Sequence, residues 1–117
     1  MVLMTLFILN DPPYGTERSY NGLRLAGALS RSGDEVFVFL IGDAAACAKS
    51  GQSVPSGCYN VEVMLRAVVR SKGTVGVCGS CMDARGIAEA DLAARTHRST
   101  MDEVAGWTRS ADKVLVF

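Results

Sequence analysis

The sequence predicts an α/β fold in which a mostly parallel sheet of four to five strands lies between two layers of helices, a three-layer α/β/α architecture. Short apolar runs alternate along the chain with longer segments in which apolar residues recur every three or four positions. This alternation is typical of strand–helix–strand units. The apolar runs contain few polar residues, as expected of parallel strands that are covered on both faces.

Length and composition restrict the classes of protein to which the chain can belong. Its 117 residues are sufficient for one hydrophobic core, so we expect a single domain over residues 1–117. Apolar residues make up 49% and charged residues 21%, which indicates a globular protein. Twelve basic and twelve acidic side chains cancel, and they form no basic cluster, so nucleic acid is not an expected partner.

The apolar run over residues 1–9 bears on localisation. It is too short to span a bilayer, and it has neither a basic segment before it nor a small-residue cleavage site after it. We therefore interpret it as a first strand rather than a signal peptide, and we expect no membrane association. A cytoplasmic location follows, in which the four cysteines stay reduced rather than forming a disulfide framework.

The first strand, over residues 2–9, is expected to end at the loop Asn10–Gly15, because two prolines there remove backbone donors and fix φ. Residues 16–31 form the first predicted helix, and Gly33 follows its end. We expect Ala26 and Gly27 to permit a close approach to the sheet. The predicted inward face consists of Tyr20, Leu23, Gly27 and Leu29 or Ser30.

The second strand is predicted over residues 36–41, followed by Gly42-Asp43 and a short helix over 44–49. Residues 50–59 have the composition of a long loop. Asn60 is a candidate N-cap for the next helix, in which Glu62 and Arg66 form an outward-facing pair. The apolar stripe of this helix, which we interpret as core, consists of Val61, Met64, Leu65 and Val68.

The third strand is expected over residues 74–77 and leads directly into Cys78. Residues 83–94 are compatible with a helix that is interrupted near its start by Gly86. A polar patch over 95–98 contains the only histidine, His97, which we interpret as a solvated loop residue. A last helix opens near Thr100, which has capping-box spacing to Glu103, and a final strand covers 114–117. Its predicted apolar side consists of Met101, Val104, Ala105 and Trp107 or Thr108.

The stretch from Thr74 to Gly86, TVGVCGSCMDARG, contains the candidate catalytic residues. Cys78 stands at the end of a strand, and Gly79 makes a turn toward a helix start near Cys81. Free N–H groups at a helix start favour an anion, so a cysteine there has a lowered pKa and a raised nucleophilicity. Arg85, four residues after Cys81, adds a second positive influence on the same helical face. Cys78 is therefore the candidate nucleophile, and Cys81 is its candidate resolving partner.

Two alternatives for the cysteines stay open at this point. Free cysteines are often small buried hydrophobic residues, although the C-x-x-C spacing after a strand makes this less expected of the pair. Structural zinc needs four ligands, and one C-x-x-C supplies half of them. Cys47, Cys58 and His97 form no second close pair, so we expect no metal.

In a parallel sheet the carboxyl ends of the strands meet at one edge, where ligands usually bind. The loops expected there are 10–15, Gly42-Asp43 and 78–81, so Asn10, Tyr14 and Asp43 are candidate supporting residues beside the thiols. No G-x-G-x-x-G motif follows the first strand, so a dinucleotide site is not expected.

The sequence resembles the DsrE/DsrF-like sulfur-relay superfamily over essentially its whole length. The motifs that carry the resemblance are the Asn-Asp-Pro-Pro-Tyr-Gly loop, Gly42-Asp43-Ala44, Gly51-Gln52, Tyr59-Asn60, Cys78–Gly86, Ser99-Thr100-Met101, Trp107 and Asp112-Lys113-Val114. The resemblance implies a compact α/β/α fold, homo-oligomers that are usually trimers or hexamers, and a persulfide on Cys78. It carries over to Cys81 less directly, because relay members often lack a second cysteine there.

The predicted function is therefore that of a cytoplasmic sulfur carrier that exchanges sulfane sulfur with donor and acceptor proteins or small thiols. This chemistry requires a reactive thiolate and no metal or organic cofactor. Asp83 and Arg85 are expected either to bind substrate or to pair across the helix start. A thiol–disulfide oxidoreductase is the second hypothesis, although the motif follows the third strand and all three prolines precede it. The third hypothesis is an oligomeric binding protein in which the cysteines only pack.

Overall fold

The computed structural model describes residues 2–117, in which five strands form one parallel sheet with the order β4-β3-β2-β1-β5. The strands are β1 (Met4–Leu9), β2 (Glu35–Leu40), β3 (Thr74–Cys78), β4 (Thr96–Ser99) and β5 (Lys113–Val116). The helices are α1 (Arg18–Arg31), α2 (Val61–Arg70), α3 (Gly79–Asp83) and α4 (Met101–Ser110), with 3-10 helices η1 (Gly42–Ala48) and η2 (Glu89–Asp91). The predicted α/β class is confirmed.

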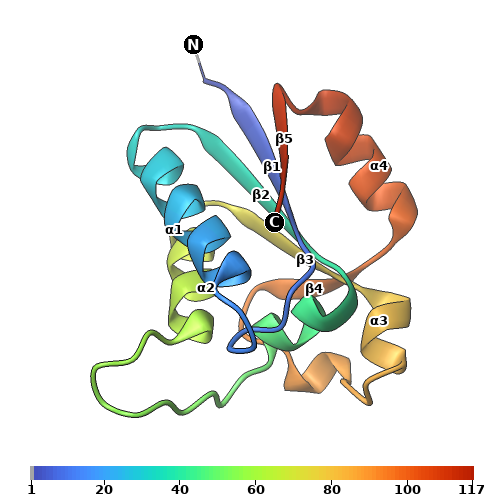
Figure 1. The fold of residues 1–117 in the computed structure, drawn as a ribbon. Coiled ribbons are helices and arrows are strands. Elements are labelled where there is room, and N and C mark those ends of the chain that lie inside the picture. The colour runs from blue at the N-terminus through green and yellow to red at the C-terminus, as the bar shows by residue number, and fades with distance from the viewer. Residues whose placement is uncertain (1) are drawn as a thin grey trace.

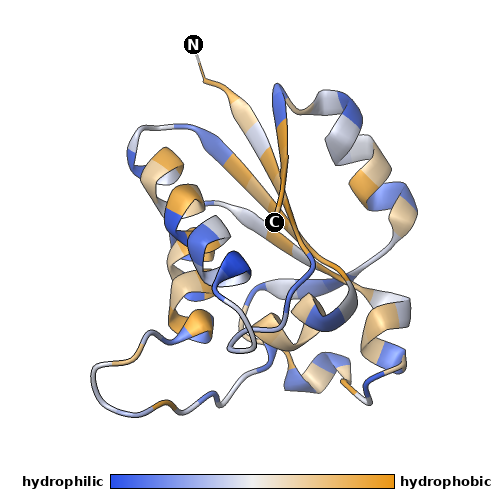
Figure 2. Ribbon diagram, in the orientation of Figure 1, coloured by the Kyte–Doolittle hydropathy of each residue, from blue (hydrophilic) through white to orange (hydrophobic). Residues whose placement is uncertain are grey.

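The sheet separates two helical layers (Figure 1). Helices α1 and α2 lie on one face and α4 lies on the other, while α3 and η1 gather at the carboxyl edge of the strands. The central strands are the most apolar part of the ribbon (Figure 2). Phe7, Leu9, Val38 and Leu40 belong to the core beneath α1 and α2, whereas Leu6 and Phe39 belong to a smaller cluster beneath α4. Successive residues of a strand therefore supply the two cores in turn.

Helix α1 starts two residues later than predicted, at Arg18, and its buried face differs from the predicted one. Leu23 is buried as expected, but Ser19, Gly22 and Ala26 complete the face, and the prediction for Gly27 was wrong. The close approach occurs at Gly22, where an added Cβ would lie 2.7 Å from a methyl carbon of Leu9. The predicted helical periodicity was right, but the buried face of α1 lies about one residue earlier along the helix than predicted.

Tyr20 and Leu29, two other predicted inward residues, are only partly buried. Tyr20 stacks on Tyr59, with ring centroids 3.9 Å apart, and Tyr59 also stacks on Tyr14. These rings fasten the start of α1 to the end of the long loop. An aromatic residue beside the buried face of a helix can thus pack against a neighbouring loop rather than against the core.

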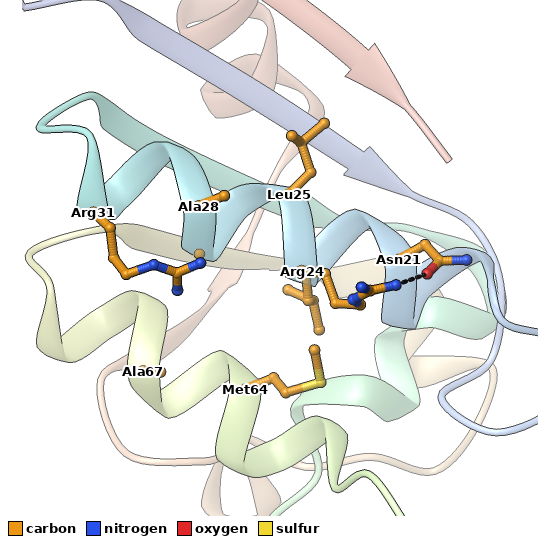
Figure 3. A pocket seen from close by; sticks show the side chains of 9 residues that line it. Asn21, Arg24, Leu25, Ala28, Arg31, Met64 and Ala67 are labelled. Carbon is orange, nitrogen blue, oxygen red and sulfur yellow. Dashed lines mark hydrogen bonds between the residues drawn. The ribbon is translucent and has the colours of Figure 1, made fainter.

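A surface groove of about 590 Å³ lies on the outer side of α1 and α2 (Figure 3). Arg24 and Arg31 lie along α1, and Met64 and Ala67 line the groove from α2. Arg24 donates a hydrogen bond to the side-chain oxygen of Asn21 at 3.2 Å. The groove is formed by the two helices alone and does not include the cysteine turn.

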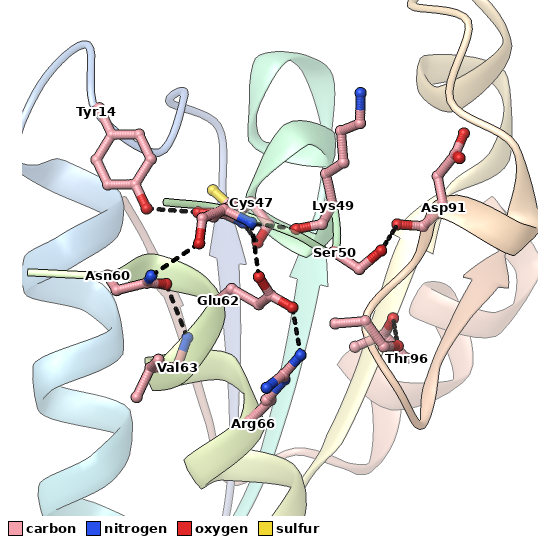
Figure 4. Close-up of polar contacts among 12 residues, drawn as sticks. Tyr14, Cys47, Lys49, Ser50, Asn60, Glu62, Val63, Arg66, Asp91 and Thr96 are labelled. Atoms are coloured by element: carbon pink, nitrogen blue, oxygen red, sulfur yellow. Dashed lines mark hydrogen bonds and ion pairs between the residues drawn. The ribbon is translucent and has the colours of Figure 1, made fainter. Parts of the chain in front are cut away.

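The long loop before α2 is held by a buried carboxylate (Figure 4). Glu62 is only 4% exposed, so the predicted outward-facing position was wrong, although its predicted pair with Arg66 is present at 2.6 Å. The second Glu62 oxygen accepts the backbone N–H of Gln52 at 2.9 Å. The loop folds back over this carboxylate and buries it. Asn60 caps α2 as predicted by accepting the N–H of Val63 at 3.1 Å.

Strand β4 was not predicted. Its four residues include His97, which had been interpreted as a solvated loop histidine, and they pair with β3 at the edge of the sheet. Polar residues are common in edge strands, so this segment lacked the apolar signal of the other strands. His97 and Ser99 both hydrogen-bond to Oε1 of the Glu103 carboxylate of α4. Thr100 does cap α4, by accepting the N–H of Glu103.

Two further predictions about helices were wrong. Residues 83–94 do not form one helix, because α3 ends at Asp83 and Gly86 adopts a φ of +65° that ends helical geometry. Met101 is 58% exposed rather than part of the apolar side of α4. Val104 is buried there, and Trp107 packs on Phe37 with ring centroids 5.1 Å apart.

Met1, which belongs to the predicted N-terminal apolar run, lies outside the described residues. Within residues 2–117, the helices are all too short or too polar to cross a bilayer.

Substitutions at two glycines, one crowded and one in open space, can test how closely the chain packs. An added Cβ at Gly73 would lie 2.6 Å from a Val68 methyl carbon and 2.8 Å from the Val68 carbonyl oxygen, whereas nothing lies within 4 Å at Gly106 in α4. Gly73→Ala should lower the free energy of unfolding by about 1–3 kcal/mol through overpacking. Gly106→Ala should raise it by about 0.5–1 kcal/mol through helix propensity. Denaturant unfolding measures both, and equal effects of the two substitutions would contradict the packing at Gly73.

Candidate active site

The fold places the cysteine motif at the carboxyl edge of the sheet. Strand β3 ends at Cys78, and α3 begins at the next residue, so Cys78 is the N-cap of a five-residue helix. The helix begins two residues earlier than the predicted start near Cys81. Pairing of β3 with β2 aligns Val77 with Leu40, which brings the turn beside the start of η1 at Gly42.

Cys78 is shielded from solvent. Its side chain is 5% exposed and belongs to the cluster beneath α4, together with Phe39 and Val104. The Cys78 Sγ atom lies 3.4 Å from the hydroxyl oxygen of Ser80, within hydrogen-bond distance for sulfur. The thiol therefore has apolar neighbours on one side and polar groups of its own turn on the other.

Cys81 lies in a different environment. It is partly buried and contacts both core clusters, and its Sγ accepts the backbone N–H of Gly42 at 3.1 Å. Gly42 has a φ of +61°, a conformation that favours glycine. The left-handed backbone conformation of Gly42, just after β2, thus places its N–H group within hydrogen-bond distance of the Cys81 sulfur.

The two thiols have opposite pKa shifts. Burial raises the pKa of Cys78, but hydrogen bonds from Ser80, from the Cys81 thiol and from the Cys81 and Ser80 N–H groups outweigh it, and the pKa is lowered. Burial and the hydrogen bond with Cys78 raise the pKa of Cys81, against smaller lowering effects of Gly42 and Arg85. Cys78 is therefore the more acidic thiol of the pair, and the Cys81 thiol hydrogen-bonds to it.

Arg85 and Asp43 are brought together beside Cys81. The Arg85 guanidinium donates to Asp43 Oδ1 from Nε at 3.1 Å and from Nη2 at 2.7 Å, and Nη1 donates to the Cys81 carbonyl oxygen at 3.1 Å. Arg85 thus lies beside Cys81, and its positive charge acts to lower the pKa of that thiol. The placement of Asp43 near the cysteine turn agrees with the predicted edge of the sheet.

Asp83 pairs with a residue that the sequence did not single out. Arg98 of β4 donates from Nη1 and Nη2 to the two oxygens of Asp83 at 2.8 and 2.9 Å. The hydrogen bonds and the positive charge of Arg98 lower the pKa of the Asp83 carboxyl group. Arg98 was missed because its proximity depends on an edge strand without an apolar pattern.

The other predicted supporting residues lie in different surroundings. The Asn10 side chain donates to the carbonyl oxygen of Phe117 at 3.1 Å. The Tyr14 hydroxyl donates to Gln52 and accepts the N–H of Val61 at 3.1 Å, so it anchors the long loop (Figure 4). Asp43 therefore lies beside the cysteine turn, whereas Tyr14 makes its hydrogen bonds with the long loop and the start of α2.

The remaining cysteines and the histidine are outside this turn. Cys47 is buried, and this burial raises its pKa to about 12, whereas Cys58 is exposed on the long loop. His97 hydrogen-bonds to Glu103, and its ring packs edge-on against Trp107. Within residues 2–117, no group of three or more His, Cys, Asp or Glu side chains is arranged to hold a metal ion.

Known proteins are similar to this chain in sequence and in fold. A model of the DsrE/DsrF-like family matches residues 4–117. The chain belongs to this family. Protein YchN of Escherichia coli is 39% identical over 114 residues, which cover 96% of this chain and 97% of YchN. An uncharacterised protein of Methanopyrus kandleri is 34% identical over 110 residues, which cover 94% of this chain and 90% of the relative.

Solved structures extend the comparison to the fold. The crystal structure of Escherichia coli YchN matches with a TM-score of 0.92 and 38% identity, and the match covers 100% of both chains. A conserved protein of unknown function from Bacteroides thetaiotaomicron matches with a TM-score of 0.69 and 18% identity, over 97% of this chain and 94% of that one. The second match shows the fold alone.

The opposite shifts of the two thiols can be tested by alkylation. The rate of iodoacetamide reaction at Cys78 should rise with pH with an apparent pKa below the value of about 8.5 typical of a free cysteine. Cys81→Ala should raise this pKa, because it removes one hydrogen-bond donor to the thiolate. Arg85→Ala should change it less, because Arg85 contacts the Cys81 carbonyl. Mass spectrometry identifies the alkylated residue, and a larger effect of Arg85→Ala than of Cys81→Ala would contradict this geometry.

Proposed function

We propose that this protein is a sulfur-relay carrier that holds sulfane sulfur as a persulfide on Cys78, with Cys81 as the resolving thiol. The observation that carries the proposal is the division of roles within the cysteine pair. Cys78 ends β3 beside the Ser80 hydroxyl and has a lowered pKa, whereas Cys81 lies beside the Gly42 N–H and has a raised pKa, so Cys78 is the more readily ionised, attacking sulfur. Membership of the DsrE/DsrF-like family supports the same chemistry.

The proposed cycle uses two displacements at sulfur. The Cys78 thiolate attacks the sulfane sulfur of a donor, a new S–S bond forms, and the donor's leaving group departs with the electron pair. An acceptor thiolate then attacks the terminal sulfur of the persulfide, and the Cys78 thiolate leaves. No electron is gained or lost overall, so the cycle requires neither a redox cofactor nor a metal. The acceptor is a protein or a small thiol of the cytoplasm.

Cys81 supplies a second exit from the persulfide. Once deprotonated, it attacks the inner sulfur on Cys78, expels hydrosulfide and leaves a Cys78–Cys81 disulfide. The raised pKa of Cys81 slows this reaction, because only the thiolate attacks.

The carrier hypothesis and the oxidoreductase hypothesis differ in what each cysteine must do. After exposure to inorganic polysulfide, Cys81→Ser should accept one sulfur atom on Cys78 and retain it several-fold longer than the wild type, because the neighbouring thiol is absent. Cys78→Ser should accept none at this turn. Intact-protein and peptide mass spectrometry over time measure both. Sulfur on Cys47 or Cys58 alone would identify the wrong thiol, and absence of sulfur from all variants would support a packing role.

We also propose that the protein assembles with itself, as a homotrimer or homohexamer. Helix α4 covers only part of its face of the sheet, and a groove of about 460 Å³ remains between them. Its lining is mostly apolar and includes Ile8, Phe39, Ile41 and Met101. Val116 of the edge strand β5 is 65% exposed. Apolar surface of this kind supports a protein interface.

Sedimentation should show a species several times the 12.4 kDa mass of one chain. Met101→Asp should shift the protein toward the monomer, because it places a charge on the apolar groove. Val63→Asp is the matched control, since Val63 is similarly exposed, at 54%, on α2. A wild-type protein found only at 12.4 kDa at micromolar concentration would contradict assembly.

A further inference from the structure

A positively charged side chain, that of Arg98, lies next to the nucleophilic turn. In the sheet register, Arg98 pairs with Val77 and the next residue of β4 pairs with Cys78. The Arg98 side chain extends across Gly79, where an added Cβ would lie 2.8–2.9 Å from the Nε, Cζ and Nη2 atoms of the guanidinium. The guanidinium therefore packs against the backbone of Gly79, the residue that follows the sulfur nucleophile in the chain.

The guanidinium already binds an oxyanion in the form of Asp83. Two parallel hydrogen bonds join Nη1 and Nη2 to the two carboxylate oxygens, which is the planar, two-point arrangement that arginine makes with carboxylates and with other oxyanions. The pair is accessible, with 39% of the Arg98 side chain and 64% of the Asp83 side chain exposed. Exposed ion pairs are weak, so a more highly charged anion can replace the carboxylate.

The charge of Cys78 reaches this cation, as the smallest of several influences on it. The pKa of Arg98 is raised mainly by the hydrogen bonds and charge of Asp83, and the charge of Cys78 contributes to the same shift. Arg85, the other arginine of the site, pairs with Asp43 in the same way but also donates to the Cys81 carbonyl, so it belongs to the second cysteine. Arg98 lies against Gly79, the residue after Cys78, and is therefore the cation on the Cys78 side of the turn.

We propose that Arg98 binds the sulfur donor, and that the donor is a small oxyanion carrying a sulfane sulfur, of which thiosulfate is the simplest example. The proposal rests on the carrier function proposed above and names its substrate class. Asp83 occupies the guanidinium in the absence of donor and gives way to the donor's oxygens. The sulfonate end then faces Arg98 while the sulfane sulfur faces Cys78.

The transfer is balanced without another reactant. The Cys78 thiolate attacks the sulfane sulfur of thiosulfate, the new S–S bond forms, and the bond to the sulfonate sulfur breaks. Sulfite leaves with the electron pair, and the persulfide on Cys78 carries one negative charge. The charge is the same before and after the step. Arg98 stabilises the sulfonate oxygens as negative charge builds on the leaving sulfite.

The experiment compares sulfur loading of Cys78 by thiosulfate in the wild type, Arg98→Gln, Arg98→Lys and Asp83→Asn, with loading by inorganic polysulfide in the wild type as the reference for carrier function. Arg98→Gln should reduce the loading rate with thiosulfate about tenfold, because a charged hydrogen-bonding partner is lost. Arg98→Lys should restore part of the rate, and Asp83→Asn should increase it, because the competing carboxylate is neutralised. Arg95→Gln removes an exposed arginine three residues earlier and is the matched control.

Alkylation separates anion binding from thiol reactivity. Iodoacetate and iodoacetamide differ by one negative charge, so the ratio of their rates at Cys78 reports attraction of an anion to the site. This ratio should fall in Arg98→Gln and rise in Asp83→Asn, while Arg95→Gln leaves it unchanged. Thermal unfolding of each variant identifies any loss of folding.

The outcomes distinguish the two proposals. Wild-type loading from polysulfide together with unchanged thiosulfate loading in Arg98→Gln would overturn the role of Arg98 and leave the carrier function standing. Loading from polysulfide but not from thiosulfate would overturn the donor class. Failure of both donors to add sulfur to Cys78 would overturn the carrier function and this inference with it.

Discussion

The parallel register of β3 between β2 and β4 is the constraint on which the candidate site depends. Pairing with β2 brings Cys81 to the backbone N–H of Gly42, and pairing with β4 brings Arg98 across Gly79. A shift of one residue would turn Cys78 to the opposite face of the sheet. The apolar side chains of both cores fix the register, so the energy of folding also determines where the thiols lie.

The sequence was sufficient to predict the architecture because the fold depends on repeated, local signals. The strands β1, β2 and β3 are apolar runs, and the α2 stripe has clear helical periodicity. The phase of α1 was wrong because Gly22 and Ser19 carry no apolar signal, although they face the core. Their burial follows from the need for a close approach between helix and sheet, which a hydrophobicity pattern does not record.

Part of the candidate site was predictable for the same reason. Cys78 ends β3, Cys81 and Asp43 closely follow strand ends, and strand ends converge in a parallel sheet. The partners of Glu62 and Asp83 were not predictable, because Gln52 and Arg98 reach them from a long loop and a polar edge strand. The assignment of Arg85 to Cys81 rather than Cys78 also required the actual path of the turn, since α3 ends before the expected helix is complete.

The shortness of α3 has a consequence for how the thiols respond to their surroundings. A helix of five residues is not stable alone, and two ion pairs connect the segment around it to the rest of the protein: Asp43 with Arg85, and Asp83 with Arg98. Both pairs are exposed enough to be screened by dissolved ions. The apolar sheet is not weakened by such screening. Ionic strength therefore acts on the geometry of the cysteine turn separately from the stability of the fold.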